Sequence, residues 1–501
     1  ATYEQLEGAL RALGATLEKS YPAINSIAVS VPKGKLKQLA SESWVEHVSH
    51  DFTVMKSDDF TTQHTYAQSA WTYGGTTNDG LGVNIAIVDS GINNAQDFSG
   101  ANYSSRVVHR EDFSSHGTDV LGELLFDPCG HGTHVAGIAA GNGRSSSGRN
   151  AHRTYIGEAP KGGLVGVRVL ERDGSGSVSN VLAGLQWISD HGQEWNVKVI
   201  NLSLGHPVGE SMKTDPLCRM VETLWKKGYV VVCAAGNMGR LYDGQKPALD
   251  NEGWGTAYGS ISSPGNSPYV ITVGAMKRTA SNLRADDKVA TYSSRGPSIF
   301  DYTLKPDLMA PGNLVTSVGP SGGFLFANYP RNLVPLTSYL LNTLLRDPFD
   351  NNYYVLSGTS MAAPAVSGAA AVMLQKEPWL TPDTIKARMM VTATKWEYPN
   401  PNMADDDSDY NGSDPCSFGA GFLNLQAAMG SSVAVASGYY ATSPSLVLDD
   451  KGNLVFDNDT IMFGTRAVWG TGIPDPRAVW GTRAVWGTTV VGGTRAVWGL
   501  E

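Results

Sequence analysis

The chain has 501 residues, a formal net charge of −9 and 41% hydrophobic residues. This length allows roughly two to four domains. The acidic balance without a basic block argues against a nucleic-acid binder, and no apolar run approaches the ~20 residues that a membrane-spanning helix needs. The sequence starts at Ala1 without a signal-peptide pattern, so composition leaves the compartment open.

The cysteines do not define a metal site or a disulfide scaffold. Their spacing contains no C-x-x-C pair. The sequence is compatible with one or two disulfides, including a bridge between Cys129 and Cys233, and equally with four free thiols. The four residues are Cys129, Cys218, Cys233 and Cys416.

Residues 1–58 are expected to form a small separate unit. Leucines at helical spacing predict a helix over residues 3–21. Strand, helix and strand patterns follow at 26–34, 35–43 and 44–52. The polar residues 56–65 are interpreted as a linker to the next domain.

A larger domain, residues 59–430, alternates apolar strands with helices. Continuous Val/Ile runs between helices favour a mainly parallel sheet covered on both faces, a doubly wound α/β fold. Functional groups gather at the carboxyl ends of the strands in such sheets. The expected strands are 83–90, 164–170, 198–205, 228–236 and 269–275, and the expected helices include 133–141, 178–192 and 217–228. Irregular pieces are expected at 318–353 and 396–417.

Residues 431–501 form a C-terminal extension of different character. The pentapeptide RAVWG occurs four times, at 466–470, 477–481, 483–487 and 495–499. The intervals are unequal, so the segment does not resemble a solenoid. Short strands that pack on each other or on the preceding domain are one interpretation, and a role in anchoring, assembly or surface binding is another.

Two short segments contain candidate acid–base residues. The strand AIVDSGI (86–92) ends at Asp89, where a carboxylate can orient a histidine, although an ordinary turn Asp also fits. In GHGTHVAG (130–137), His131 lies between two glycines before a helix. His134 follows one turn later, but no H-E-x-x-H pattern supports a metallohydrolase. His134 is interpreted as a packed helix residue, and His116 as an exposed loop residue.

Two further segments contain a hydroxyl and an amide. Ser360 lies in SGTSMAAPAVSG, at the amino end of a small-residue helix whose N–H groups can hold an oxyanion. Asn237 follows a buried strand in CAAGNMG and can donate to developing negative charge. Alone, Ser360 could be a simple helix cap and Asn237 a turn residue.

Together these segments resemble the subtilisin family of serine endopeptidases, through AIVDSGI, GHGTHVAG, AAGN and GTSMAAP in this order. The resemblance covers most of residues 1–430. It implies that Ser360 attacks the scissile carbonyl, His131 is the general base and Asp89 orients it. It also implies that Asn237 and the Ser360 N–H form the oxyanion hole.

The resemblance further implies that a protein or peptide substrate binds as an added strand. One edge would be Gly174, Ser175 and Gly176. The other would be Ser203, Leu204 and Gly205. Gly236 and residues 262–269 would border the pocket for the residue before the cut. No acidic residue occurs in these pocket segments, so large apolar or aromatic side chains are expected there.

Residues 1–58 resemble the inhibitory propeptide of the same family, which implies an exported zymogen inhibited by its own propeptide. Cleavage is expected between about Phe52 and Asp59. The usual first strand of such a propeptide is missing, because the predicted helix begins directly after Ala1. The resemblance implies a secreted, extracellular enzyme.

No cofactor is expected for catalysis. By analogy with the family, the resemblance implies that loop carboxylates could bind structural calcium. The candidate ligands are Asp97, Asp405, Asp406 and Asp407. The alternative hypothesis is a non-catalytic binding or adhesive protein on the same scaffold. The presence of all three triad residues and of Asn237 argues against that alternative.

Overall fold

The computed structural model describes two compact units, Ala1–Ser57 and Asp58–Glu501. Its described residues are 3–21, 26–45, 48, 60–114, 126–241, 255–277, 287–319, 322–341, 353–394, 415–448 and 454–456. No helix among these residues is long and apolar enough to cross a membrane. The RAVWG repeats and the acidic cluster Asp405–Asp407 lie outside the described residues.

The N-terminal unit has the element order helix, strand, strand, helix. The elements are α1 (Tyr3–Ala12), β1 (Thr16–Tyr21), β2 (Ser26–Ser30) and α2 (Leu36–Ala40). β1 and β2 pair antiparallel. A small core of its own contains Leu10, Leu13, Ala15 and Leu39.

The predicted helix over residues 3–21 is wrong in its second half. The chain leaves α1 at Gly14, whose φ of 69° is a left-handed conformation that glycine adopts at helix ends. Leu17, at helical spacing in the sequence, reaches the same core from strand β1. The strand expected at 44–52 begins in a turn at Trp44, and most of its residues lie outside the described part.

The second unit is built on an eight-stranded sheet. The order is β11-β10-β7-β6-β3-β5-β4, with β12 also paired to β10. Every pairing is parallel except that of β10 with β11, so the expected mainly parallel sheet is confirmed. The strands are β3 (Asn84–Asp89), β4 (Val107–Asp112), β5 (Gly163–Arg168), β6 (Val197–Leu202), β7 (Val230–Ala234), β10 (Ile271–Lys277), β11 (Lys288–Val289) and β12 (Leu308–Pro311).

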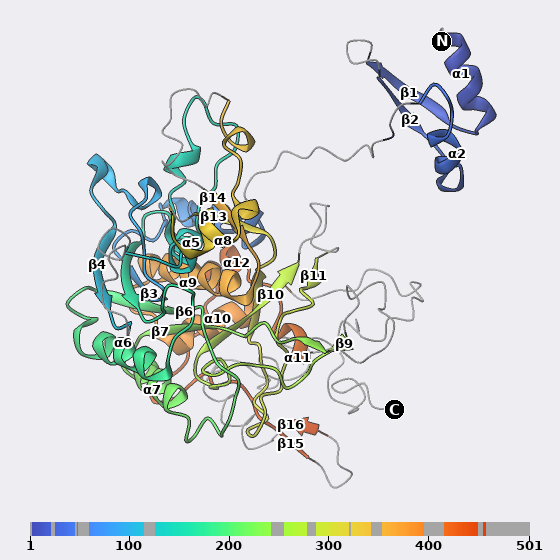
Figure 1. The fold of residues 1–501 in the computed structure, drawn as a ribbon. Helices are drawn as coiled ribbons and strands as arrows, with labels where there is room; N and C mark the ends of the chain where they lie inside the picture. The colour runs from blue at the N-terminus through green and yellow to red at the C-terminus, as the bar shows by residue number, and fades with distance from the viewer. Residues whose placement is uncertain are drawn as a thin grey trace. The chain divides into compact units, whose positions relative to one another are not determined.

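Helices lie against the sheet in two groups (Figure 1). α5 (His131–Ala140) and α9 (Thr359–Lys376) pack together, and α6 (Val178–His191) packs with α7 (Pro216–Lys226). α5 and α9 are buried nearly all round and carry almost no polar stripe. Helices on both faces of a parallel sheet make the expected doubly wound α/β architecture.

Side chains at the amino ends of several helices explain where these helices begin. Ser177 caps α6 by accepting the Asn180 N–H, and Asp215 caps α7 by accepting two N–H groups, with Pro216 in the first helical position. Thr381 and Pro382 repeat this pattern at α10 (Pro382–Thr392). Helices α5 and α9 lack such caps.

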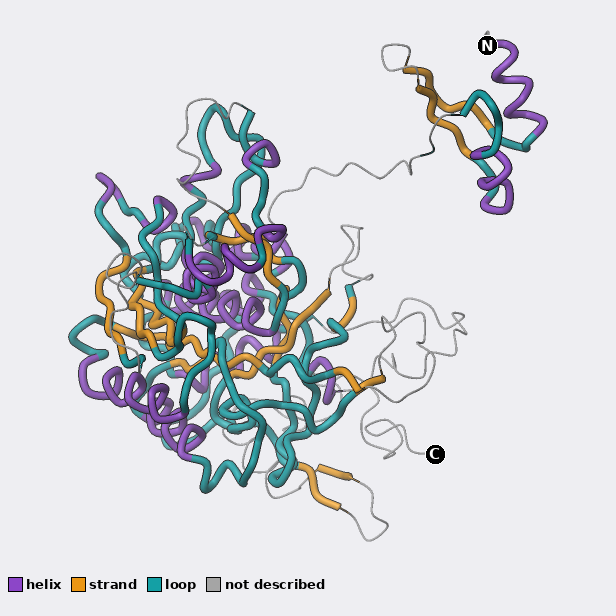
Figure 2. The backbone as a smooth tube through the Cα atoms, viewed as in Figure 1, coloured by secondary structure: helices purple, strands orange, loops and turns teal. Residues whose placement is uncertain are grey.

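Shorter elements surround the sheet (Figure 2). They are α3 (Phe60–His64), α4 (Ala67–Ala70), β8 (Arg240–Leu241), β9 (Gly255–Thr256), β13 (Val315–Val318), α8 (Gly323–Asn328), β14 (Tyr353–Leu356), α11 (Pro415–Phe418), α12 (Leu425–Gly430), β15 (Leu446–Leu448) and β16 (Leu454–Phe456). The expected irregular piece at 318–353 therefore contains α8 between the paired strands β13 and β14.

Two expected boundaries differ from the structure. The proposed linker 56–65 contains helix α3, and Thr65 is buried with its hydroxyl on the Glu158 carboxylate at 2.8 Å. The proposed extension from 431 onward is not separate at first, because Ala441 and Leu446 are buried in the main core. The core of the second unit therefore includes residues up to at least 446.

Candidate active site

Asp89 and His131 come together at the carboxyl end of the central strand β3. Nδ1 of His131 lies 2.7 Å from Oδ1 of Asp89, and the N–H of Ser90 donates to the same oxygen at 2.7 Å. Asp89 is fully buried, whereas 23% of the His131 side chain is exposed. The imidazole is therefore oriented by a carboxylate on its inner side and is accessible to solvent.

Glycine allows helix α5 to approach β3 this closely. A Cβ atom on Gly132 would lie 2.2 Å from the carbonyl oxygen of Gly91, in the turn that follows Asp89. Any side chain at this position would push the first turn of α5, and His131 with it, away from the carboxylate. The glycines around His131 are thus part of its positioning.

The pKa of His131 is raised above its ordinary value. Burial lowers it, but the charge of Asp89, the hydrogen bond to Asp89 and the charge of Asp127 together outweigh burial. The imidazolium that forms when the histidine accepts a proton is therefore stabilised by two neighbouring carboxylates.

Ser360 is the second residue of α9, and its position depends on a proline one turn later. Pro364 has no N–H, so the carbonyl oxygen of Ser360, its normal partner in the helix, lacks a helical donor. The hydroxyl of Ser203 fills this gap by donating to the Ser360 oxygen at 2.8 Å. The Ser360 hydroxyl in turn donates to the Ser203 carbonyl oxygen at 3.1 Å. Ser360 is thereby tied to the end of strand β6.

The Asn237 side chain is held with its oxygen toward Thr359 and its NH₂ group directed away from Thr359. Its Oδ1 accepts the Thr359 N–H at 2.9 Å and the Thr359 hydroxyl at 3.1 Å. The same hydroxyl accepts the Gly236 N–H at 3.1 Å, which fixes its direction. Because the oxygen is occupied, the NH₂ group of Asn237 is the part available to an oxyanion beside Ser360.

The two expected substrate edges lie after β5 and β6. Gly176 forms an isolated bridge with Leu170, and Gly174 has a left-handed φ of 85° in the turn before it. On the other side, Ser203 contacts Ser360 while Gly205 is exposed.

Leu204 and Ser175 complete these edges, half-buried and exposed respectively. Both edges follow strands adjacent to β3, so they lie at the same end of the sheet as Asp89.

The expected pocket segments pack against one another. A Cβ on Gly236 would lie 2.4 Å from the Ser262 hydroxyl, and one on Gly205 would lie 2.7 Å from the Ser263 carbonyl oxygen. Asp215 lies behind this wall, but it is 1% exposed and accepts the Ser263 hydroxyl and two helix N–H groups. Its charge is therefore satisfied within the fold.

The other candidates have structural environments. His134 is fully buried, its Nε2 contacts the Tyr354 carbonyl oxygen at 2.9 Å, and burial lowers its pKa to about 3. A metal pair with His131 is not supported by this arrangement. His116 lies outside the described residues.

The cysteines are four buried free thiols, so the suggested bridge between Cys129 and Cys233 is not formed. Burial, with the nearby charge of Asp127, raises the pKa of Cys129 to about 12. A thiol with so high a pKa is a poor nucleophile at neutral pH, which leaves the hydroxyl of Ser360 as the candidate nucleophile.

Asp97 does not fit the expected role of a calcium ligand. Its Oδ1 accepts the Ser145 N–H at 2.6 Å, its Oδ2 accepts the Tyr353 hydroxyl, and the Arg106 guanidinium donates to its carbonyl oxygen at 2.6 Å. Calcium requires a shell of oxygen acceptors, whereas donors surround Asp97. The described residues contain no group of three or more His, Cys, Asp or Glu side chains that could hold a metal.

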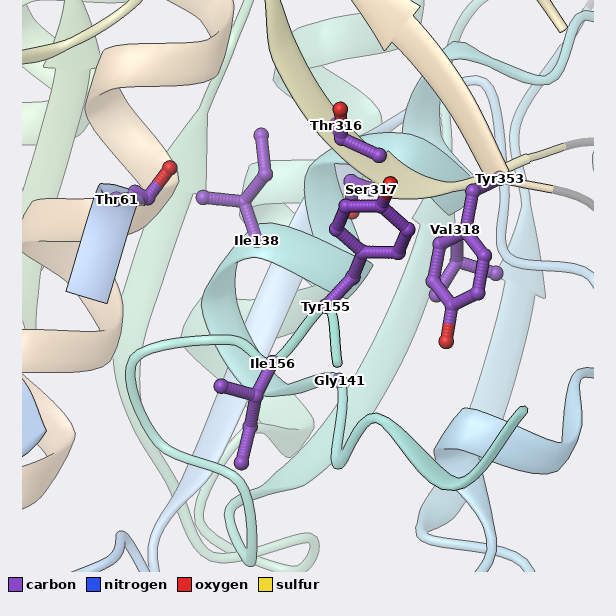
Figure 3. Close-up of a pocket in the computed structure, with 10 residues that line it drawn as sticks. Thr61, Ile138, Gly141, Tyr155, Ile156, Thr316, Ser317, Val318 and Tyr353 are labelled. Atoms are coloured by element: carbon purple, nitrogen blue, oxygen red, sulfur yellow. The ribbon is translucent and has the colours of Figure 1, made fainter. Parts of the chain in front are cut away.

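A small cavity lies beside helix α5 (Figure 3). It is lined by Ile138 and Gly141 of α5, by Ser317 and Val318 of β13, and by Tyr353. Its volume of about 10 Å³ is close to what a single water needs. It is therefore a packing gap and not a substrate site.

Sequence reasoning missed Ser90, Asp127 and Thr359. Ser90 and Thr359 are direct neighbours of Asp89 and Ser360, so the motifs contained them without showing their bonds. Asp127 had no signal beyond its place four residues before His131. Its bonds to Gly130 and Thr133 are local, but those to Ser90 and Asn93 span 37 and 34 residues, and only the folded chain reveals them.

Comparisons with known proteins show which family this chain resembles. The subtilase family matches residues 80–421. Serine protease AprX of Bacillus subtilis (strain 168) is 33% identical over 397 residues, which cover 77% of this chain and 78% of that protein. Subtilisin E of the same strain is 29% identical over 392 residues, covering 76% and 78%. The solved structure of Sphericase shows 26% identity and a TM-score of 0.47 over 72% of this chain and 96% of that chain.

The family match spans more than half of the chain, and the chain covers most of AprX. The protein therefore belongs to the subtilase family and is a subtilisin-like serine endopeptidase.

Proposed function

We propose that the endopeptidase hydrolyses peptide bonds through Asp89, His131 and Ser360, with Asn237 in the oxyanion hole. The observation that carries this proposal is the 2.7 Å contact between Asp89 Oδ1, at the end of β3, and His131 Nδ1, on helix α5, which packs against the helix whose second residue is Ser360. A hydroxyl nucleophile needs a base, and the base needs a third group that fixes its tautomer.

In the proposed mechanism, Nε2 of His131 removes the proton from the Ser360 hydroxyl as Oγ attacks the scissile carbonyl. The hydroxyl donates to Ser203 in the present structure, so its hydrogen turns toward the imidazole before attack. The Asn237 NH₂ and the Ser360 N–H stabilise the tetrahedral oxyanion. His131 then donates its proton to the leaving amine, and the same steps with water release the acyl product.

The substrate backbone is proposed to bind as a strand between Gly174–Gly176 and Ser203–Gly205. The side chain before the cut would enter the pocket bordered by Gly205, Gly236 and Ser262. The pocket segments contain no acidic residue, and the nearby Asp215 is already satisfied. This supports a preference for large apolar or aromatic residues over Lys and Arg.

The N-terminal unit is proposed to be an inhibitory propeptide, removed by cleavage near residues 52–58. Its small core, formed by its own residues Leu10, Leu13, Ala15 and Leu39, supports this role. An exported zymogen follows from this proposal, and with it an extracellular enzyme. Calcium binding by Asp405–Asp407 also stays a proposal.

Mass spectrometry of the purified full chain over time tests the proposal beside a Ser360→Ala variant. We expect the native chain to lose about its first 52–58 residues and to cleave an unfolded protein. The Ser360→Ala variant should stay intact, with a loss of activity of about 10⁶-fold, as seen when the nucleophile of subtilisin is removed.

Ser357→Ala is the matched control. Its hydroxyl lies three residues earlier in the same segment and accepts the Leu314 N–H at 2.9 Å, so its removal should leave processing intact. Equal processing in the Ser360→Ala and native chains would contradict the assigned nucleophile. Cleavage mainly after Lys or Arg would contradict the proposed preference of the pocket for apolar or aromatic side chains.

A further inference from the structure

One buried carboxylate next to the active site has no part in the mechanism above. Asp127 is fully buried, four residues before His131. Its two carboxylate oxygens accept four hydrogen bonds. Oδ1 accepts the Ser90 hydroxyl at 2.8 Å and the Gly130 N–H at 2.7 Å, and Oδ2 accepts the Thr133 N–H at 2.7 Å and the Thr133 hydroxyl at 2.6 Å.

The direction of all four bonds is fixed. Gly130 and Thr133 contribute backbone N–H groups, which can only donate. The Thr133 hydroxyl accepts the Asn93 N–H at 2.9 Å, and the Ser90 hydroxyl accepts the Gly132 N–H at 2.9 Å. Each hydroxyl therefore has its hydrogen left for Asp127. A group that only accepts is required at this position, which is the ionised carboxylate.

These bonds join the two segments that carry the catalytic pair. Ser90 directly follows Asp89 at the end of β3, and Gly130 and Thr133 flank His131 in the first turn of α5. The main chain of Asp127 is bonded on both sides to the Asn93 side chain, at 2.8 and 3.1 Å. The loop after β3 and the start of α5 are thus held through one buried residue.

We propose that Asp127 is a positioning residue for catalysis. It fixes the distance between Asp89 and His131, and its negative charge stabilises the imidazolium. The proposal rests on the proposed role of His131 as the base. Asp127 itself does not touch the substrate, and it acts through Ser90 and the first turn of α5.

Electrostatics gives this role a signature that simple packing would not have. His131 is faced by Asp89 from β3, by Asp127 and Cys129 from the loop before α5, and by His134 from its own helix. Burial raises the pKa of Asp127, while the hydrogen bonds from Thr133, Gly130 and Ser90 lower it. Removing the Asp127 charge should lower the pKa of His131.

The test is the pH profile of kcat/KM for the full chain with Asp127→Asn, normalised by active-site titration. An amide in place of the carboxylate turns its NH₂ toward at least one backbone N–H, so the first turn of α5 must shift. Because misplacement of about 1 Å can cost about 10²-fold, we expect kcat to fall about 10- to 100-fold. The acid limb should also move to lower pH.

Two further variants separate charge from geometry. Thr133→Val removes one donor and keeps the carboxylate, so kcat should fall by a smaller factor and the acid limb should stay. Asp383→Asn is the matched control, because Asp383 is a buried acceptor at the start of α10, bonded to Trp225 and Ala441. It should lower thermal stability and leave the acid limb unchanged.

The outcomes distinguish this inference from the proposed function. If Asp127→Asn keeps the native acid limb and loses no more kcat than Asp383→Asn, the positioning role is wrong. If Asp127→Asn does not fold, a Thr133→Val enzyme with native kcat would overturn the role just as well. If His131→Ala retains activity, the triad itself is wrong, whatever Asp127 does.

Discussion

Helices α5 and α9 begin in the same way and use their first turns differently. Each starts at or next to a proposed catalytic residue, follows a glycine and lacks a side-chain cap from the preceding residue. At α5, Asp127 and Ser90 accept the N–H groups of Gly130, Gly132 and Thr133. At α9, Asn237 accepts the Thr359 N–H, and the next N–H, that of Ser360, is the one proposed to bind the oxyanion.

In the proposed mechanism, this difference lets one structural feature serve two chemical tasks. The amino end of a helix has unsatisfied donors and a positive partial charge. When a buried carboxylate takes these donors, the turn becomes a rigid support for a base. When a donor is left for the substrate, the turn stabilises negative charge that forms only during the reaction. Variants at Asn237 and Ser203 test the start of α9, and the pH dependence of activity tests the start of α5.

The largest effect on activity is expected at the amino end of α9, where the Ser360 N–H and the Asn237 side chain are proposed to bind the oxyanion. Asn237→Ala removes the side-chain donor and should lower kcat about 10²- to 10³-fold with little change in KM, the size known for the oxyanion Asn of subtilisin itself. The measurement is steady-state kinetics on a peptide substrate. Met238→Ala, an exposed neighbour, is the control. A change confined to KM would show that Asn237 binds the ground state instead.

An intermediate effect, on the free energy of unfolding, is expected at the Ser360 carbonyl oxygen. Pro364 cannot donate to this oxygen, and the Ser203 hydroxyl donates to it instead. Ser203→Ala should cost about 1–3 kcal/mol, because this oxygen then has no donor. Adding Pro364→Ala restores a helical N–H one turn below it. The double variant should therefore lose less stability than the sum of the singles, with a coupling of about 0.5–3 kcal/mol.

Urea unfolding in a Ser360→Ala background, which prevents self-digestion, measures this cycle. Ser367→Ala in place of Ser203→Ala is the matched control, because its hydroxyl bonds Asn201 and not Ser360. Strict additivity of Ser203→Ala and Pro364→Ala would mean that the proline does not direct the Ser360 carbonyl.

The smallest effect is a displacement of the acid limb of activity. The base must be neutral, and the raised pKa of His131 means that activity is lost as pH falls through a value above the ordinary 6.5. The same shift stabilises the fold below the unfolded pKa, and this stability is lost as pH rises through the folded pKa. Activity should therefore fall in this window without unfolding. A kcat/KM midpoint at or below 6.5 would contradict the raised pKa.

The buried parallel strands were predictable from sequence, and the polar or edge elements were not. β3, β6 and β7 have continuous apolar runs and were expected within a few residues. β4 was missed because VVHRED lies at the sheet edge with half of its side chains partly exposed. β12 was missed because it is four residues long and ends in proline.

The catalytic candidates could be predicted because each lies at a strand end or helix start within a glycine-rich motif. Their supports could not, because the contacts cross long stretches of chain. Ser203 reaches Ser360 across 157 residues, and Ser90 reaches Asp127 across 37. Asp97 shows that a residue suggested by the sequence can have a different environment in the fold. Its sequence suggested a calcium ligand, but the folded chain surrounds it with donors from Ser145 and Tyr353.

Labelling with a serine-directed sulfonyl fluoride, followed by peptide mass spectrometry, tests the central claim most directly. We expect one label per chain, on Ser360, and a strong loss of labelling in His131→Ala, because the base must activate the hydroxyl. A label on another serine, or equal labelling rates in the native and His131→Ala chains, would contradict the assignment of nucleophile and base.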